Sequence, residues 1–176
     1  YKCTTTHLSI IIRVIKQTNM TQTKVIGESV KKTNKAFVKS YTQGYCDALT
    51  ENLKLYTIAM YKRPTFGGEV RSTPSQYQLD RLAEIENGTA NLDVFKAIEG
   101  KKYYKVVSCE WSEDKQEYRE RSVVTFIDKN TGDVYKPASW RSPAKHVRYT
   151  FQNPDHIKFL LDPNKVDWAG GHLYMR

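Results

Sequence analysis

The chain has few cysteines and no long apolar run, and each lack excludes a class of protein. Its 176 residues include three cysteines, Cys3, Cys46 and Cys109. Cysteines that are odd in number and widely spaced fit neither a disulfide framework nor a paired-cysteine metal site. The longest apolar stretch, residues 8–15, is interrupted by polar residues and is far shorter than the roughly 20 residues that cross a bilayer. We therefore expect no disulfides, no membrane span and no secretion.

The patterns of common cofactor and metal sites are also missing. Gly67 and Gly68 are not followed by Gly-Lys-Ser/Thr, and no dinucleotide glycine fingerprint occurs, which argues against nucleotide hydrolysis. The histidines lack the His-x-x-x-His spacing of zinc sites. The segment after Asp128 begins like an EF-hand, but its glycine is one position early and Ser139 replaces the final glutamate, so we predict a hairpin turn. The sequence thus predicts neither a metal nor a cofactor.

Two arrangements leave catalysis open. Cys46 could pair with His146 or His156 as a nucleophile and base, although a cysteine on an apolar helix face is typical of a core. A group of acidic residues could serve a metal-dependent nuclease, but their spacing also fits a turn and the solvent face of strands. These acidic residues are Glu110, Glu113, Asp114, Glu117 and Glu120. For both arrangements the structural interpretation is favoured, so we expect a protein that is not a catalyst.

Charge is distributed unevenly along the chain. The formal net charge is +9, and lysine and arginine outnumber acidic residues at both ends, whereas the middle is mildly acidic. A positive field raises the rate of encounter with polyanions without specifying a fold. The composition therefore favours an anionic partner.

Cations and aromatic rings alternate between residues 135 and 149, with no acidic residue among them. Phosphates attract ammonium and guanidinium groups, and aromatic faces stack on unpaired bases. We predict single-stranded nucleic acid as the partner, with Trp140 and Tyr149 stacking, Arg141 and Arg148 binding phosphate, and Lys145 adding charge. The predicted contact residues are Tyr135, Lys136, Trp140, Arg141, Lys145, Arg148 and Tyr149. The alternative is that Trp140 and Trp168 anchor a core and Lys136 covers their edges.

The first half of the chain has helical periodicity. Apolar residues recur at three- and four-residue spacing over residues 24–52, with Gly44 as a weak point that could divide the helix. Residues 53–61 fit either a continuing helix or a strand, and residues 63–68 predict a loop. Thr73 and Pro74 predict the cap and first residue of a second helix, which Asn87 and Gly88 end.

The second half has the pattern of strands. Residues 103–107 and 118–127 predict two strands joined by an acidic turn, and a tight turn at residues 128–133 leads to a third. Four prolines after residue 136 predict an irregular lobe, closed by a short strand at Leu173 and Tyr174. We predict an α+β fold, with N-terminal helices packed on a small antiparallel β-sheet and an irregular C-terminal lobe.

The domain prediction places one α+β domain at residues 20–176. Residues 1–19 precede the first methionine, Met20, and we interpret them as an extension that is either non-native or flexible. Their β-branched residues would also suit a short strand.

One segment resembles a known group of proteins. The residues that carry the resemblance are Phe126, Ile127, Asp128, Lys129, Thr131, Gly132, Asp133, Tyr135, Lys136, Pro137, Ala138, Ser139, Trp140, Pro143, Ala144, Lys145 and Arg148. The run resembles short hypothetical proteins of tailed phages of aquatic bacteria. The resemblance implies a phage origin, with a location in the cytoplasm of a bacterial host or in the virion, and it transfers no catalytic residue. A nucleic-acid-binding accessory protein and a virion or assembly component that contacts other phage proteins are the two functions it leaves open.

Overall fold

The computed structural model describes residues 34–63, 65–66, 69–70 and 73–174. The chain divides into two units, residues 1–37 and 38–176, and only residues 34–37 of the first unit are described. The predictions for residues 1–19 and for the start of the first helix lie outside the described residues.

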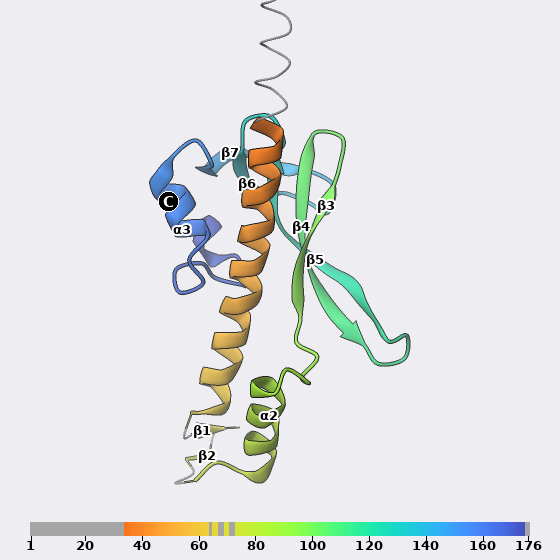
Figure 1. Ribbon diagram of the computed structural model, residues 1–176, viewed down its shortest axis with the longest axis vertical. Coiled ribbons are helices and arrows are strands. Elements are labelled where there is room, and N and C mark those ends of the chain that lie inside the picture. The colour runs from red at the N-terminus through yellow and green to blue at the C-terminus, as the bar shows by residue number, and fades with distance from the viewer. Residues whose placement is uncertain (1–33, 64, 67–68, 71–72, 175–176) are drawn as a thin grey trace, which may run out of the picture. The chain divides into compact units, whose positions relative to one another are not determined.

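A long helix runs over residues 34–61 (Figure 1). Residues 34–52 confirm the predicted helix, and residues 53–61 continue it. The side chains of Val38, Thr42, Tyr45 and Leu49 are buried at three- and four-residue intervals, which is the stripe that packs on a sheet. The helix passes through Gly44 without interruption. A Cβ atom there would lie 2.9 Å from Leu161 Cδ2, so the absent side chain leaves room for a neighbouring segment.

Five antiparallel strands form the main sheet, in the order of the sequence. They are β3 (Val94–Glu99), β4 (Tyr103–Ser112), β5 (Glu117–Asp128), β6 (Asp133–Pro137) and β7 (Pro143–Thr150). The sequence predicted β4, β5 and the start of β6, and missed β3 and β7. The expectation that prolines keep the chain irregular after residue 136 was wrong for β7, because Pro137 ends one strand and Pro143 begins the next, where proline is tolerated.

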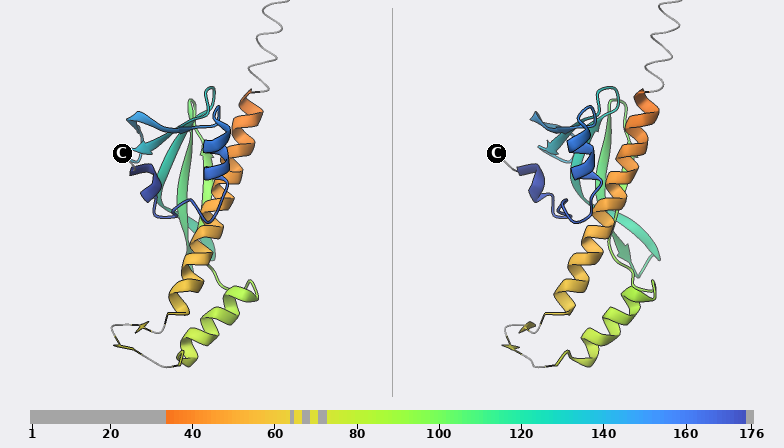
Figure 2. Two further views of the ribbon diagram at one scale, coloured as in Figure 1. Left: turned by 90° about the vertical axis from the view of Figure 1, so that its left-hand side faces the viewer. Right: turned by 60° about the vertical axis from the view of Figure 1, so that its left-hand side comes forward.

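The long helix packs against one face of this sheet (Figures 1 and 2). The paired residues Tyr104, Ile127, Val134 and Tyr149 form a row across β4 to β7 on this face, and the first three are buried with Leu49 in the core. The predicted α+β class, with a helix on an antiparallel sheet, is thereby confirmed.

A small hairpin and a second helix follow the long helix. β1 (Thr65–Phe66) pairs with β2 (Glu69–Val70) where a loop was predicted. α2 (Gln76–Glu86) begins two residues after the predicted position, because Ser75 forms a capping box with Gln78, whereas Thr73 lies outside the helix. Its end at Asn87 and Gly88 is as predicted.

The C-terminal segment contains α3 (Pro154–Leu160) and a 3-10 turn, η1 (Gly171–Tyr174). The prediction of a closing strand at Leu173 and Tyr174 was therefore wrong. Leu160 and Leu173 are fully buried in the core. No helix in the described part of the chain has both the length and the apolar character needed to cross a membrane.

Candidate nucleic-acid interface

The face of the sheet turned away from the long helix is called the outer face here. Because side chains alternate across a strand, the neighbours of the core-facing row point to this side. The outer-face row is continuous over all five strands, since each residue pairs with the next. Its members are Ile98, Lys105, Phe126, Tyr135 and Val147.

Aromatic rings cluster along the outer face. The ring of Tyr103 meets those of Phe126 and Tyr135 edge to face, each at a centroid distance of 6.1 Å. Trp140 reaches this side from the connection between β6 and β7 and is 41% exposed. Of these rings Trp140 is exposed, Tyr103 and Tyr135 are half-buried, and Phe126 is buried, so the outer face carries an aromatic cluster with Trp140 as its accessible ring.

Three lysines lie over aromatic rings in this region. The ammonium group of Lys105 is 4.3 Å from the centre of the Trp140 ring, and that of Lys102 is 5.0 Å from the centre of the Tyr103 ring. A third, Lys96, is placed 4.8 Å from the ring of Tyr118. Each of these three contacts thus places a positive charge next to an aromatic ring on the same part of the surface.

Acidic residues balance part of this charge. Glu120 is 3.9 Å from Lys105, and Asp128 is 3.7 Å from Lys102. The Lys102 side chain is mostly exposed, and the buried Asp128 carboxylate also accepts two backbone N–H groups, so it keeps hydrogen-bond partners when the lysine turns away. Lys102 can therefore turn to another anion more readily than Lys105, whose side chain is 20% exposed.

One buried donor near this face is unsatisfied. The indole Nε1 of Trp111 is buried and has no hydrogen-bond partner among the described residues. Its ring packs edge to face on Tyr118, at 5.1 Å. Buried N–H groups without partners are rare, and such a donor can serve a ligand or an ordered water.

Four of the predicted contact residues lie at this face or its adjoining loop, three of them exposed and Tyr135 half-buried. Tyr135 lies in the outer-face row, and burial together with the charge of Asp133 raises its pKa. Trp140 and Arg141 occupy the exposed β6–β7 connection, and Lys145 is exposed on β7.

The other three predicted residues make internal contacts. Lys136 places its ammonium 3.9 Å from the centre of the Tyr174 ring. Tyr149 stacks on Phe159 at 5.3 Å and donates its hydroxyl to the carbonyl oxygen of His172 at 3.1 Å. The Nε atom of Arg148 is buried, without a hydrogen-bond partner in the described part of the chain. Tyr149 thus faces the core, on the opposite side of the sheet from Tyr135.

Sequence reasoning missed Tyr103, Lys105 and the two other lysine–ring pairs. The sequence predicted a strand over residues 103–107, but it did not show to which side of the sheet Tyr103 and Lys105 point. Only the pairing of Lys105 with Phe126, and of Phe126 with Tyr135, brings these strands beside residues 135–141.

The candidate nucleophile Cys46 lies in the core, apart from this face, whereas Glu120 of the acidic group lies beside Lys105. Cys46 is fully buried, as the core interpretation predicted, and burial raises the pKa of its thiol to about 12. The backbone N–H of Thr150 donates to Nδ1 of His156, and His146 is exposed. Among the described residues, no three His, Cys, Asp or Glu side chains are grouped as metal ligands.

The Asp128 segment is a hairpin turn, as predicted. The Asp128 carboxylate accepts hydrogen bonds from the backbone N–H groups of Asn130 and Thr131, and Gly132 has a φ of 75°. The carboxylate is therefore engaged in shaping the turn between β5 and β6.

Comparison with known protein families gives a match over most of the chain. A family model described as a family of unknown function (DUF7717) matches residues 22–175. Neither the curated proteins nor the solved structures contain a protein that matches the chain.

Proposed function

Because the chain belongs to the DUF7717 family of unknown function, we propose a role from its own surface: it binds single-stranded nucleic acid on the outer face of the sheet. The role is that of a non-catalytic accessory protein. The resemblance of the segment around Trp140 to proteins of tailed phages supports a phage origin for it.

The observation that carries this proposal is the pairing of lysines with rings on one sheet face. Lys102 and Lys105 lie over Tyr103 and Trp140, and Tyr135 lies beside them in the same region. A nucleic-acid strand offers a phosphate and a flat base at every step, so a surface that alternates cations and rings matches both groups.

The energies favour exchange of the internal contacts for a bound strand. A cation over an exposed ring contributes about 0.5–1 kcal/mol, whereas stacking of a base on a ring contributes about 1–3 kcal/mol. When the exposed ammonium group of Lys102 moves from Tyr103 to a phosphate, it keeps an electrostatic partner and uncovers the phenol ring. The bases of a duplex are already stacked on one another, so a single strand is the better ligand.

The affinity for single strands is expected to fall as the salt concentration rises. The full chain is expected to bind fluorescein-labelled dT20 or U20, and contact of about three phosphates gives a log–log slope near −2 for single strands. Affinity should then fall about twentyfold between 50 and 200 mM salt in a fluorescence anisotropy titration. A hairpin duplex of equal length is the comparison and should bind more weakly.

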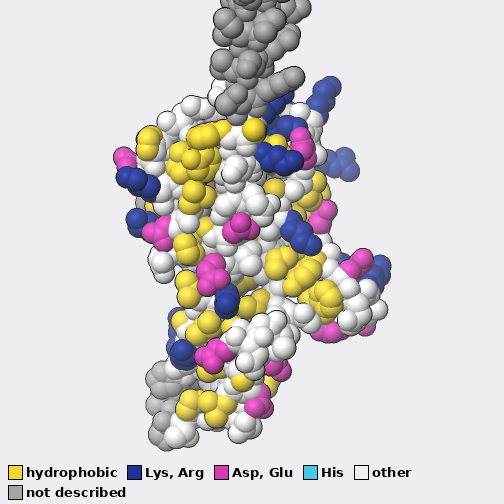
Figure 3. Space-filling model, viewed as in Figure 1, with side chains coloured by type: hydrophobic (Ala, Val, Ile, Leu, Met, Phe, Trp, Pro, Cys, Tyr) yellow, Lys and Arg dark blue, Asp and Glu magenta, His cyan; other side chains and the backbone are white. Residues whose placement is uncertain are grey.

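Three outcomes would overturn the proposal. Affinity that does not depend on salt would exclude phosphate contacts, and preference for the duplex would exclude base stacking. Absence of binding, together with self-association in sedimentation velocity, would favour an assembly component. For that alternative the chain offers exposed apolar side chains on the long helix and α2, among them Leu55, Tyr56 and Leu79, and Figure 3 shows apolar side chains at the surface in this part of the molecule.

A substitution at Trp140 tests whether the strand binds on the outer face. Trp140→Ala should weaken binding of the single strand about tenfold, since it removes one stacking ring. Tyr77→Ala is the matched control, because Tyr77 is a 58% exposed aromatic residue on α2, away from the sheet face. Equal losses of affinity in the two variants would show that the strand does not use the outer face.

A further inference from the structure

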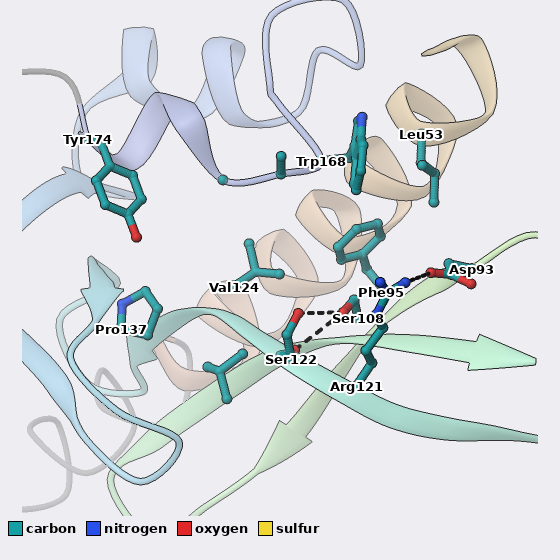
Figure 4. A pocket seen from close by; sticks show the side chains of 13 residues that line it. Leu53, Asp93, Phe95, Ser108, Arg121, Ser122, Val124, Pro137, Trp168 and Tyr174 are labelled. Atoms are coloured by element: carbon teal, nitrogen blue, oxygen red, sulfur yellow. Dashed lines mark hydrogen bonds and ion pairs between the residues drawn. The ribbon is translucent and has the colours of Figure 1, made fainter. Parts of the chain in front are cut away.

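A pocket of about 380 Å³ lies on the helix-facing side of the sheet, beside the C-terminal segment (Figure 4). Leu53 of the long helix, Phe95 of β3 and residues 168–170 border it, and β4 and β5 form its floor. Small-molecule sites commonly have volumes of roughly 300–1,000 Å³. The outer face is on the other side of the sheet, so this is a separate site.

The pocket has apolar and aromatic walls. Trp168 and Tyr174 stand at opposite ends in Figure 4, with Val124 between them on the floor. Trp168 is held in place because its backbone N–H donates to Asn52 Oδ1 at 2.9 Å and its ring packs on Tyr56 at 5.4 Å. A flat ligand can pack over Val124 against the ring of Trp168, which is already positioned.

Hydroxyl groups provide the polar part of the floor. Ser108 and Ser122 lie on adjacent strands with their Oγ atoms 2.7 Å apart. When one hydroxyl donates to the other, the second keeps a proton to donate, and both keep lone pairs to accept. The two hydroxyl groups can therefore donate a hydrogen bond to a polar atom on the edge of a ligand ring and accept one from another.

The charges that line the pocket cancel. The guanidinium group of Arg121 is 3.2 Å from the carboxylate of Asp93, and both side chains line the pocket, whereas Glu110, 3.6 Å from the same guanidinium, does not line it. An anionic ligand would meet the Asp93 carboxylate, and a cationic ligand would meet the guanidinium. A neutral ligand leaves this ion pair intact, which avoids an unpaired charge at a partly buried site.

We propose that this pocket binds a neutral, planar heteroaromatic molecule of about nucleoside size. Its ring packs between Trp168 and Tyr174 over Val124, and its polar edge bonds to the hydroxyls of Ser108 and Ser122. Free nucleosides and other heteroaromatic metabolites share this chemistry, and the choice of probes separates them.

The test uses the full chain with adenosine, uridine and nicotinamide as probes, followed by ligand-observed NMR and tryptophan fluorescence. At least one probe should bind with a Kd below about 1 mM. Ser122→Leu fills the pocket and removes a hydroxyl, so it should weaken binding at least about tenfold. Ser122→Ala, a smaller change, should weaken it less, and Trp140→Ala on the outer face should have no effect.

Three results would overturn the inference. The first is that no probe saturates below about 5 mM. The second is that the Ser122→Leu variant, with a native circular dichroism spectrum, binds as tightly as the parent. The third is that Trp140→Ala abolishes binding, because the probe would then occupy the outer face. If Trp140→Ala loses affinity for the single strand but still binds the probe, the two sites are independent. Failure of the proposed function can then be distinguished from failure of this inference.

Discussion

Acidification from pH 7 to pH 4.5 is expected to destabilise the folded protein by about 2 kcal/mol through His172 alone. This histidine is buried in η1, with Nε2 2.6 Å from the hydroxyl of Tyr45, and its Nδ1 accepts the backbone N–H of Asp167 at 3.1 Å. A ring that accepts at Nδ1 is neutral and carries its proton on Nε2. Protonation of Nδ1 would break the bond to Asp167.

The loss of stability on acidification follows from the different pKa of His172 in the folded and the unfolded chain. Burial lowers the pKa of His172 from 6.5 to about 4, although the carboxylate of Asp167 opposes the shift. Between these values the unfolded chain binds a proton that the folded chain does not, so the free energy of unfolding falls as the pH falls through this window. The stabilisation is fully present above the unfolded pKa of 6.5.

Urea denaturation at the two pH values measures this effect. His172→Gln removes the titrating group, so the parent should lose about 2 kcal/mol more than this variant on acidification. His146→Gln is the matched control, because His146 is exposed, and it should lose as much as the parent. Identical losses in the parent and in His172→Gln would contradict the prediction, as would an NMR titration of the His172 ring near 6.5.

The second large effect is expected at Gly132. This residue has a φ of 75°, and a Cβ atom there would lie 3.0 Å from Cβ of Phe151 and 3.4 Å from Cγ2 of Val38. Phe151 cannot move away easily, because it is buried and its backbone N–H donates to the carbonyl of Gly132 at 3.0 Å. Gly132→Ala therefore adds overpacking, about 1–3 kcal/mol, to a backbone penalty of about 1–2 kcal/mol.

Gly88 provides the matched control for this substitution. Its φ of 72° imposes the same backbone penalty, but nothing lies within 4 Å of the added Cβ. Gly88→Ala should thus lower the free energy of unfolding by about 1–2 kcal/mol, and Gly132→Ala by about 2–5 kcal/mol, in urea denaturation at pH 7. If the two variants were equally stable, the close approach to Phe151 would have no energetic consequence.

Local patterns predicted the elements whose signals are local. The helical spacing of Tyr45 and Leu49, the Asp128 turn with its glycine, and the end of α2 at Gly88 each depend on residues within a few positions. These signals are short-range because hydrogen bonds and side-chain freedom near a turn or cap decide them. They also gave the α+β class.

The elements that were missed depend on distant partners. β7 forms only because Val134 and Tyr135 offer an edge to pair with, and η1 closes where its residues meet the core around Tyr45. The N-cap of α2 was placed too early, because Thr73 and Pro74 are a good start in isolation, whereas the Ser75–Gln78 box satisfies more backbone donors.

By itself the sequence determined the excess of positive charge, the aromatic and basic composition of residues 135–149, and the periods of helix and strand. Tertiary structure alone decided which of those rings are accessible: Tyr149 turned to the core, Tyr135 to the outer face, and Tyr103 and Lys105 came from an earlier strand to join it. The reason is that consecutive side chains of a strand point to opposite faces of the sheet, so a shift of one residue in the pairing register exchanges the two faces. That register is set by contacts between strands that are distant in the sequence.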